Sequence, residues 1–130
     1  MNILIIDGQG GGIGAGLVRA VKEKRPEAFV TAAGTNALAA AAMKKAGADA
    51  AAAGENAVVV GCRSADVIIC PIACVIADAL FGEITPDMAR AVGQSGAKRI
   101  LLPFNRCGNV VVGVRELSPA ALIALAVEAI

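Results

Sequence analysis

The sequence contains no histidine, no tyrosine and no tryptophan. Their absence excludes a histidine base, a histidine metal ligand and a tyrosine acid, which are the groups most enzymes use for proton transfer near neutral pH. Few established mechanisms survive this exclusion. The sequence therefore leaves open whether the protein is an enzyme at all.

Long apolar runs are also missing, although 57% of the residues are hydrophobic. The longest stretch, Val67 to Ala77, contains Pro71 and ends at Asp78, whereas a membrane-spanning helix needs about twenty apolar residues. The first residues, Met1 to Asp7, lack the basic region and cleavage site of a signal peptide. We therefore expect a cytoplasmic protein that has no membrane partner.

Strong net charge is absent too, since the formal net charge is +1. The one basic cluster, Lys22 to Arg25, contains Glu23 and has no aromatic neighbours for base stacking. We therefore expect no nucleic-acid partner. The length of 130 residues fits one domain, residues 1–130, with a substantial core.

Apolar runs that could form strands alternate with helical patterns along the chain. We predict strands at 3–6, 28–33, 48–53, 67–70 and 99–103, and helices at 12–24, 36–46, 73–81 and 86–95, with a last helix from Ser118-Pro119. Residues 55–64 are ambiguous: Val58 to Val60 favour a strand, whereas the alternation favours the helix that we predict.

The apolar run Val110 to Val114 follows the fifth strand closely. A parallel crossover needs a dozen or more residues, so this pair should be antiparallel. The sequence thus predicts an α/β fold with a Rossmann-like doubly wound sheet, mostly parallel, and an antiparallel C-terminal edge strand.

The strongest functional signal is the glycine-rich turn after the first strand, which reads Asp7-Gly8-Gln9-Gly10-Gly11-Gly12-Ile13-Gly14. Glycines allow close backbone approach, and the N–H groups at the start of the following helix attract an anion. Gly10, Gly12 and Ala15 fit the dinucleotide signature G-x-G-x-x-A. We predict that Gly8 to Gly14 bind a phosphate-bearing ligand. The alternative is that the glycines serve only strand–helix packing.

Polar residues should lie beside this loop at the ends of two further strands. Gly34-Thr35-Asn36-Ala37 and Gly54-Glu55-Asn56-Ala57 share the pattern G-x-N-A. We predict that Thr35, Asn36, Glu55 and Asn56 line one rim with the loop. The alternative is that Thr or Asn only caps a helix after a glycine turn. No acid follows the second strand to bind an NAD ribose, which leaves an NADP-type or another nucleotide. Asp7 should accept hydrogen bonds from the loop's own N–H groups.

Four cysteines, Cys62, Cys70, Cys74 and Cys107, are present without histidine. We predict that Cys70, Cys74 and Cys107 lie near one sheet edge and that Cys62 does not. In a reduced cytosol they should be free thiols, so neither a metal site nor a disulfide is expected. Cys107, next to Asn105 and Arg106 in a loop, should be the most reactive.

Two resemblances add to this interpretation. Gly8, Gly12, Ile13 and Gly14 match G-x-x-x-G-I-G and resemble the cofactor turn of short-chain dehydrogenases, with Asp7 where that family usually carries Thr. That family's Tyr-x-x-x-Lys pair is absent, so the resemblance implies a cofactor turn without that chemistry. The segments DGQGGGIG, GTNALA, GENA, GEITP and LPFNRC resemble a small bacterial domain family of unknown function, which implies a Rossmann-like fold.

Two functions therefore compete. The first is a Rossmann-like domain that binds a nucleotide or dinucleotide, with an NADP-type dinucleotide as one candidate, and acts as a small enzyme or ligand sensor. The second is a regulatory or scaffold homodimer without chemistry, in which the glycine loop is structural. Val75-Ile76 and Leu80-Phe81 could provide an apolar patch for such a dimer.

Overall fold

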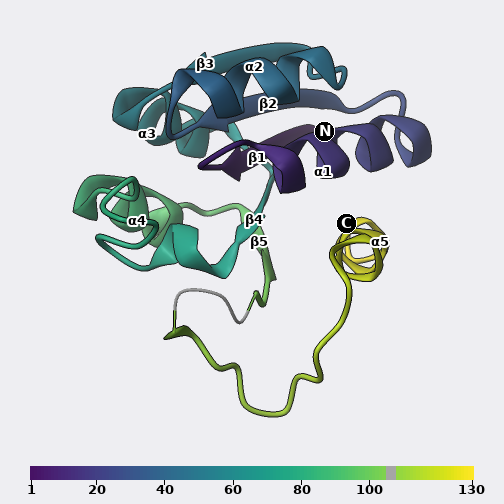
Figure 1. The fold of residues 1–130 in the computed structure, drawn as a ribbon. Helices are drawn as coiled ribbons and strands as arrows, with labels where there is room; N and C mark the ends of the chain where they lie inside the picture. Colours follow the sequence, from purple (N-terminus) through teal and green to yellow (C-terminus); the bar gives the residue numbers. More distant parts are fainter. Residues whose placement is uncertain (105–107) are drawn as a thin grey trace.

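A parallel sheet with helices on both faces forms the body of the protein in the computed structural model, which describes residues 1–104 and 108–130 (Figure 1). Its five strands, in the order β3-β2-β1-β4-β5, are β1 (Asn2–Asp7), β2 (Phe29–Gly34), β3 (Ala50–Ala53), β4 (Val67–Pro71) and β5 (Lys98–Leu102). Every neighbouring pair is parallel. The chain therefore builds the sheet outward from β1 in two directions, and the order reverses between β1 and β4.

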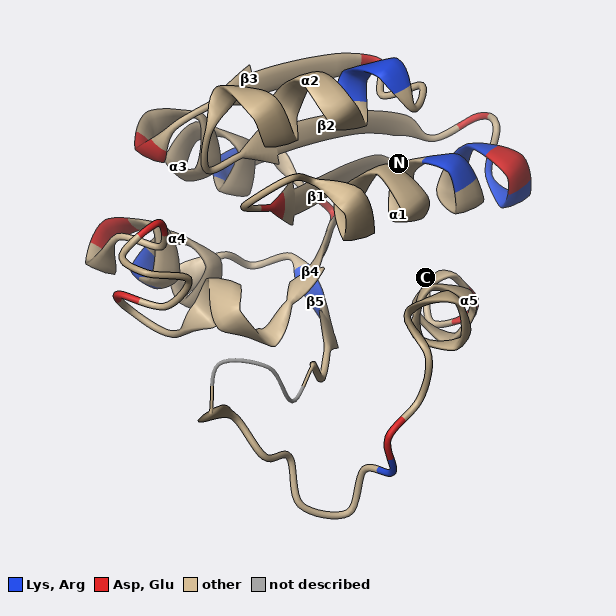
Figure 2. Cartoon of the chain, in the orientation of Figure 1, with Lys and Arg blue, Asp and Glu red and all other residues tan. Residues whose placement is uncertain are grey.

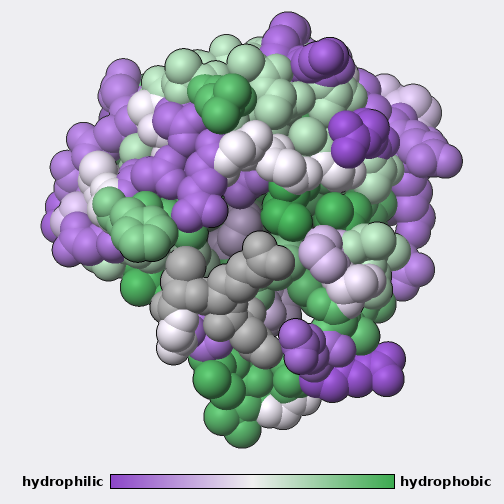
Figure 3. Space-filling view, in the orientation of Figure 1, coloured by the Kyte–Doolittle hydropathy of each residue, from purple (hydrophilic) through white to green (hydrophobic). Residues whose placement is uncertain are grey.

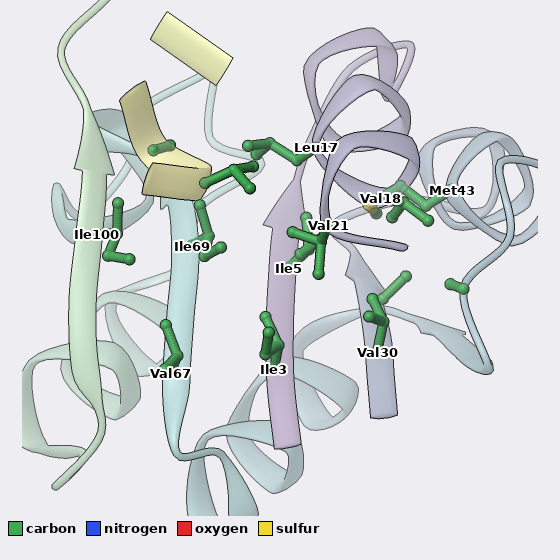
Figure 4. Packing of buried hydrophobic residues seen from close by; sticks show 14 of the residues in the cluster. Ile3, Ile5, Leu17, Val18, Val21, Val30, Met43, Val67, Ile69 and Ile100 are labelled. Carbon is green, nitrogen blue, oxygen red and sulfur yellow. The ribbon is translucent and has the colours of Figure 1, made fainter. Parts of the chain in front are cut away.

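The alternation of side chains along β1 supplies both halves of the core. Ile3 and Ile5 pack with α1 (Gly12–Lys24), α2 (Ala37–Lys45) and α5 (Pro119–Glu128) on one face (Figure 4). Leu4 and Ile6 pack with α3 (Glu55–Ser64) and α4 (Pro86–Gln94) on the other. A strand buried on both faces needs a continuous apolar run, and Ile3 to Ile6 is one.

Helix ends follow the capping signals of the sequence. The side chains of Asn36, Thr85 and Ser118 each accept a hydrogen bond from the backbone N–H group three residues later in the chain. Proline follows Thr85 and Ser118 at the first helical position. Residues 55–64 form the predicted helix. Lysines lie in the last turns of α1 and α2, at the edge of the sheet away from the glycine loop (Figure 2).

The predicted antiparallel edge strand is wrong. None of the described residues between Gly108 and Ser118 forms a strand, and Val110 and Val112 are exposed. Valine favours strands only where a neighbouring strand accepts its backbone hydrogen bonds. Here Gly108 and Gly113 have positive φ angles, and the segment leaves the body and returns at α5 (Figure 1).

The predicted helix at 73–81 is also wrong. Only a short 3₁₀ helix, η1 (Ile72–Val75), is present, followed by turns. Asp78, Leu80 and Phe81 have φ angles of 64°, 55° and 57°, and Gly82 has 87°. Left-handed residues interrupt the i to i−4 ladder, so residues 76–84, called the strap below, fold back as a compact turn.

Candidate functional site

The carboxylate of Asp7 organises the glycine loop from beneath. It accepts hydrogen bonds from the N–H groups of Gly8 (2.8 Å) and Gly14 (2.6 Å), as predicted. The side chain is buried, and this burial raises its pKa above the ordinary value, an effect that nearby Glu83 adds to and the N–H groups of the loop oppose. Asp7 therefore holds the loop and the first turn of α1 to the end of β1.

Two of the loop glycines are required by packing. Gly11 has a φ angle of 71°, and a Cβ atom there would lie 2.7 Å from Cα of Ala39 in α2. A Cβ atom on Gly14 would lie 2.5 Å from Sδ of Met43. Both contacts are shorter than side chains tolerate, so these glycines let α1 pack closely on β1 and α2.

Gly10 and Gly12 have no such reason to be glycine. A Cβ atom on either would meet nothing within 4 Å, and neither has a positive φ angle. Their N–H groups donate to no atom of residues 1–104 and 108–130. These two residues leave an open space above unpaired N–H groups at the start of α1, which is the arrangement that binds an anion.

Glu83, which the sequence analysis missed, belongs to the strap and lies beside the glycine loop. Its carboxylate accepts hydrogen bonds from N–H of Gln9 (3.1 Å to Oε1), Oγ1 of Thr35 (2.9 Å) and Nδ2 of Asn36 (2.6 Å). Thr35 and Asn36 thus lie beside the loop as expected, with their side chains engaged by Glu83. The position of Glu83 in the crossover after β4 could have indicated its place in the site, because parallel strands bring their carboxyl ends to one edge of the sheet.

A cleft of about 430 Å³ opens between the loop and the C-terminal part of the chain. Gly8, Gln9 and Ile13 form one wall, and Pro103 and Phe104 after β5 lie at another. Most remaining lining residues are apolar, with Asp7 and Glu116 as the acids: Pro71, Ile72, Ala73, Leu80, Leu117, Pro119 and Leu122. The cleft lies where the strand order reverses, the usual ligand position in such sheets.

Glu55 and Asn56 lie elsewhere. Gly34 is the last residue of β2, and Asn36 caps α2, whereas Gly54 caps α3 and both Glu55 and Asn56 lie inside that helix. The two G-x-N-A segments therefore occupy different positions relative to the start of the helix that follows each of them. Glu55 and Asn56 line a second, more polar hollow between α3 and α4, together with Arg63 and Arg90.

The described cysteines are buried free thiols. Cys74 hydrogen-bonds Cys70, and this bond together with burial raises the pKa of the Cys74 thiol well above its usual value. Cys62, expected to lie apart, packs in the same apolar cluster, and burial raises its pKa to about 11. The thiols of Cys62 and Cys74 are therefore poor nucleophiles near neutral pH. Cys107 lies outside the described residues, as do Asn105 and Arg106.

Two further properties bear on the class of site. In the described part of the chain, no group of three or more His, Cys, Asp or Glu residues is placed to hold a metal ion. No helix among the residues that the structure describes is long and apolar enough to cross a membrane.

Comparison with known proteins gives one family and one fold. Residues 2–130 match the family model described as Domain of unknown function (DUF3842). No curated protein matches the chain. Among solved structures, the dodecameric FMN-dependent UbiX-like decarboxylase from Escherichia coli O157:H7 is similar, with a TM-score of 0.50 and 19% identity over 99% of this chain and 75% of that one. At this identity the likeness concerns the fold alone.

Proposed function

This chain belongs to the family Domain of unknown function (DUF3842), and we propose from its site that it binds a flavin mononucleotide or a closely similar phosphorylated ring compound. The observation that carries the proposal is the pair Gly10 and Gly12, whose N–H groups donate to no described residue and have open space above them. Gly8, Gln9 and Ile13, on either side of these two glycines, line the cleft. A phosphate on the N–H groups would therefore bring the rest of its ligand to the cleft.

The cleft supports a ring rather than a second charged group. Its volume of about 430 Å³ falls within the range of small-molecule sites, roughly 300–1,000 Å³. Ile13, Leu80, Phe104, Leu117 and Leu122 offer apolar surface to a flat heterocycle. Among residues 1–104 and 108–130, no Lys or Arg lines the cleft, so within this part of the chain the phosphate would depend on backbone N–H groups. The E. coli decarboxylase of similar fold is FMN-dependent, which makes FMN the first ligand to test.

A titration of the purified protein with FMN, followed by flavin fluorescence and by calorimetry, tests the proposal. Gly12→Val fills the space above the N–H groups and should weaken binding at least about tenfold, since each lost 1.4 kcal/mol is tenfold in affinity. The fold should survive, because a Cβ atom at Gly12 meets nothing within 4 Å. Gly93→Val is the matched control, at an exposed glycine of α4 that has the same free space and lies outside the cleft.

Two results would overturn the proposal. One is a wild-type protein that neither binds nor is stabilised by FMN, AMP or ATP at millimolar concentration, since a ligand at a hundred times its dissociation constant stabilises by about 2.7 kcal/mol. The other is a Gly12→Val variant that binds FMN as tightly as the Gly93→Val control. Either result would favour the alternative that the glycines are structural.

We also propose that the protein is a homo-oligomer, with a dimer as the simplest form. Val110 and Val112, in the segment between β5 and α5, are 82% and 92% exposed. Figure 3 shows apolar side chains gathered at the lower end of that view, where the segment between β5 and α5 leaves the body. Exposed apolar residues gathered on this segment favour coverage by another copy.

A further inference from the structure

The glycine loop has two unequal halves. At Gly10 and Gly12 the N–H groups have no hydrogen-bond acceptor among the residues that the structure describes. At Gln9, the N–H group donates to both carboxylate oxygens of Glu83, at 3.1 and 3.2 Å. The second half faces β2, because Thr35 and Asn36 at the end of that strand donate to the same carboxylate.

In dinucleotide-binding sheets of this order, the second nucleotide lies toward the end of the second strand, where polar side chains bind its ribose. Here the donors at that position are already used. Oε1 of Glu83 alone accepts from Gln9, Thr35 and Asn36, and Nδ2 of Asn36 also donates to the carbonyl of Gln9 at 2.9 Å. A ribose or a 2′-phosphate could reach these donors only by displacing a carboxylate held by charge-assisted hydrogen bonds.

The strap is also held by contacts that do not involve the glycine loop. The Ile84 side chain is fully buried, and the N–H group of Asp78 donates to the carbonyl of Ile84 at 2.7 Å. Leu80 packs against the apolar cluster under the strap and lines the cleft. Glu83 is therefore held in place by its neighbours in the strap as well as by the loop.

We propose that Glu83 makes the site selective for mononucleotides, by filling the half of the glycine loop that the second nucleotide of a dinucleotide would need. Two effects combine. The carboxylate occupies the donors, and its negative charge repels a further phosphate group. This inference rests on the proposed binding of a mononucleotide at Gly10 and Gly12, and it adds the residue that sets the size and charge of the ligand.

Calorimetric titration with FMN and with NADP, on the wild type and three variants, tests the inference. Glu83→Ala removes both bulk and charge, Glu83→Gln removes the charge alone, and Glu27→Ala removes an exposed carboxylate at the opposite edge of the sheet. We expect wild type and Glu27→Ala to bind FMN at least about tenfold more tightly than NADP, a preference of about 1.4 kcal/mol. Glu83→Ala should bind NADP at least about tenfold more tightly than wild type does. The affinity of Glu83→Gln for NADP should lie between those of wild type and Glu83→Ala.

The outcomes separate this inference from the proposed function. If no protein binds FMN, the proposed function fails. If wild type binds FMN and Glu83→Ala keeps the wild-type preference against NADP, selectivity does not come from Glu83 and the inference fails alone. If Glu83→Ala loses FMN binding without gaining NADP, Glu83 contacts the mononucleotide itself, which also overturns the inference. Thermal unfolding of each variant shows whether the fold is retained.

Discussion

At the scale of single residues, the buried carboxylate of Asp7 carries the most information. A buried acid costs free energy unless its hydrogen bonds are made, and Asp7 makes them with Gly8 and Gly14 at the two ends of the loop. The sequence predicted this because aspartate in a turn commonly accepts from the N–H groups that follow. It did not predict Glu83, since nothing local in the sequence shows where the strap folds.

The raised pKa of Asp7 predicts a pH dependence of stability. In the unfolded chain the group titrates near 3.8, whereas burial raises its pKa in the folded protein. The folded state therefore holds the proton more tightly, and the free energy of unfolding should fall as pH rises from 3.8 through the folded pKa. Asp7→Asn removes this ionisation. Its free energy of unfolding should therefore increase relative to that of wild type as the pH rises from 3.8 through the folded pKa.

Urea denaturation of wild type and Asp7→Asn, from about pH 4 to about pH 8, measures the difference. A constant offset between the curves reports the lost carboxylate acceptor, and the change of the offset with pH reports the ionisation. Glu27→Gln, at an exposed position, controls for the general effect of removing one charge. Parallel curves for wild type and Asp7→Asn would contradict the prediction.

The glycine loop predicts opposite effects of two neighbouring substitutions. Gly11→Ala forces a Cβ atom to 2.7 Å from Cα of Ala39 at a φ angle of 71°, so it should cost about 1–3 kcal/mol of stability. Gly10→Ala meets nothing within 4 Å and should stay within about 0.5 kcal/mol of wild type. Chemical denaturation measures both, and equal losses would show that Gly10 is structural too.

At the scale of elements, the strap and the segment after β5 show where sequence patterns stop being informative. The capping residues Asn36, Thr85 and Ser118 act over three residues, so the sequence located those helices well. Residues 76–84 and 108–118 take their conformation from distant contacts and from left-handed residues such as Leu80 and Phe81. Apolar content alone suggested a helix in one and a strand in the other.

The left-handed conformation of Phe81 predicts a stabilising substitution. Its φ angle is 57° and its ring is 98% exposed, so the residue bears backbone strain without burying its side chain. Phe81→Asn should raise the free energy of unfolding by about 0.5–1 kcal/mol, since asparagine tolerates this conformation better. Phe81→Ala, which removes the ring but keeps the strain, is the control. A Phe81→Asn variant that is less stable than Phe81→Ala would contradict the prediction that asparagine relieves backbone strain at this position.

At the scale of the whole molecule, the cleft joins segments far apart in the sequence. Gly8 and Ile13 belong to the first loop, Leu80 to the strap, and Phe104, Leu117 and Leu122 to the last part of the chain. The glycine loop and its place after a central strand were visible in the sequence because both are local. The apolar walls were not, because their residues look like ordinary core residues until the fold brings them together.

The proposed self-association predicts a change of molecular mass. Val112→Asp places a charge on a side chain that is 92% exposed, so it should leave the folded chain intact and dissociate an oligomer that covers this segment. Light scattering measures the mass, and Val60→Asp, at an exposed position of α3, is the control. A wild-type protein that is monomeric at every concentration would contradict the proposal, and so would unchanged oligomers of Val112→Asp.

The position of α5 also has a consequence for biosynthesis. Gly10 and Gly12 leave the ribosome before the wall formed by Leu117, Pro119 and Leu122, which is made more than a hundred residues later. At about 5–20 residues per second, several seconds separate the two events. During translation the nascent chain therefore carries the glycine loop without the apolar wall beside it, and the ligand we propose can be fully enclosed only once residue 122 has left the ribosome.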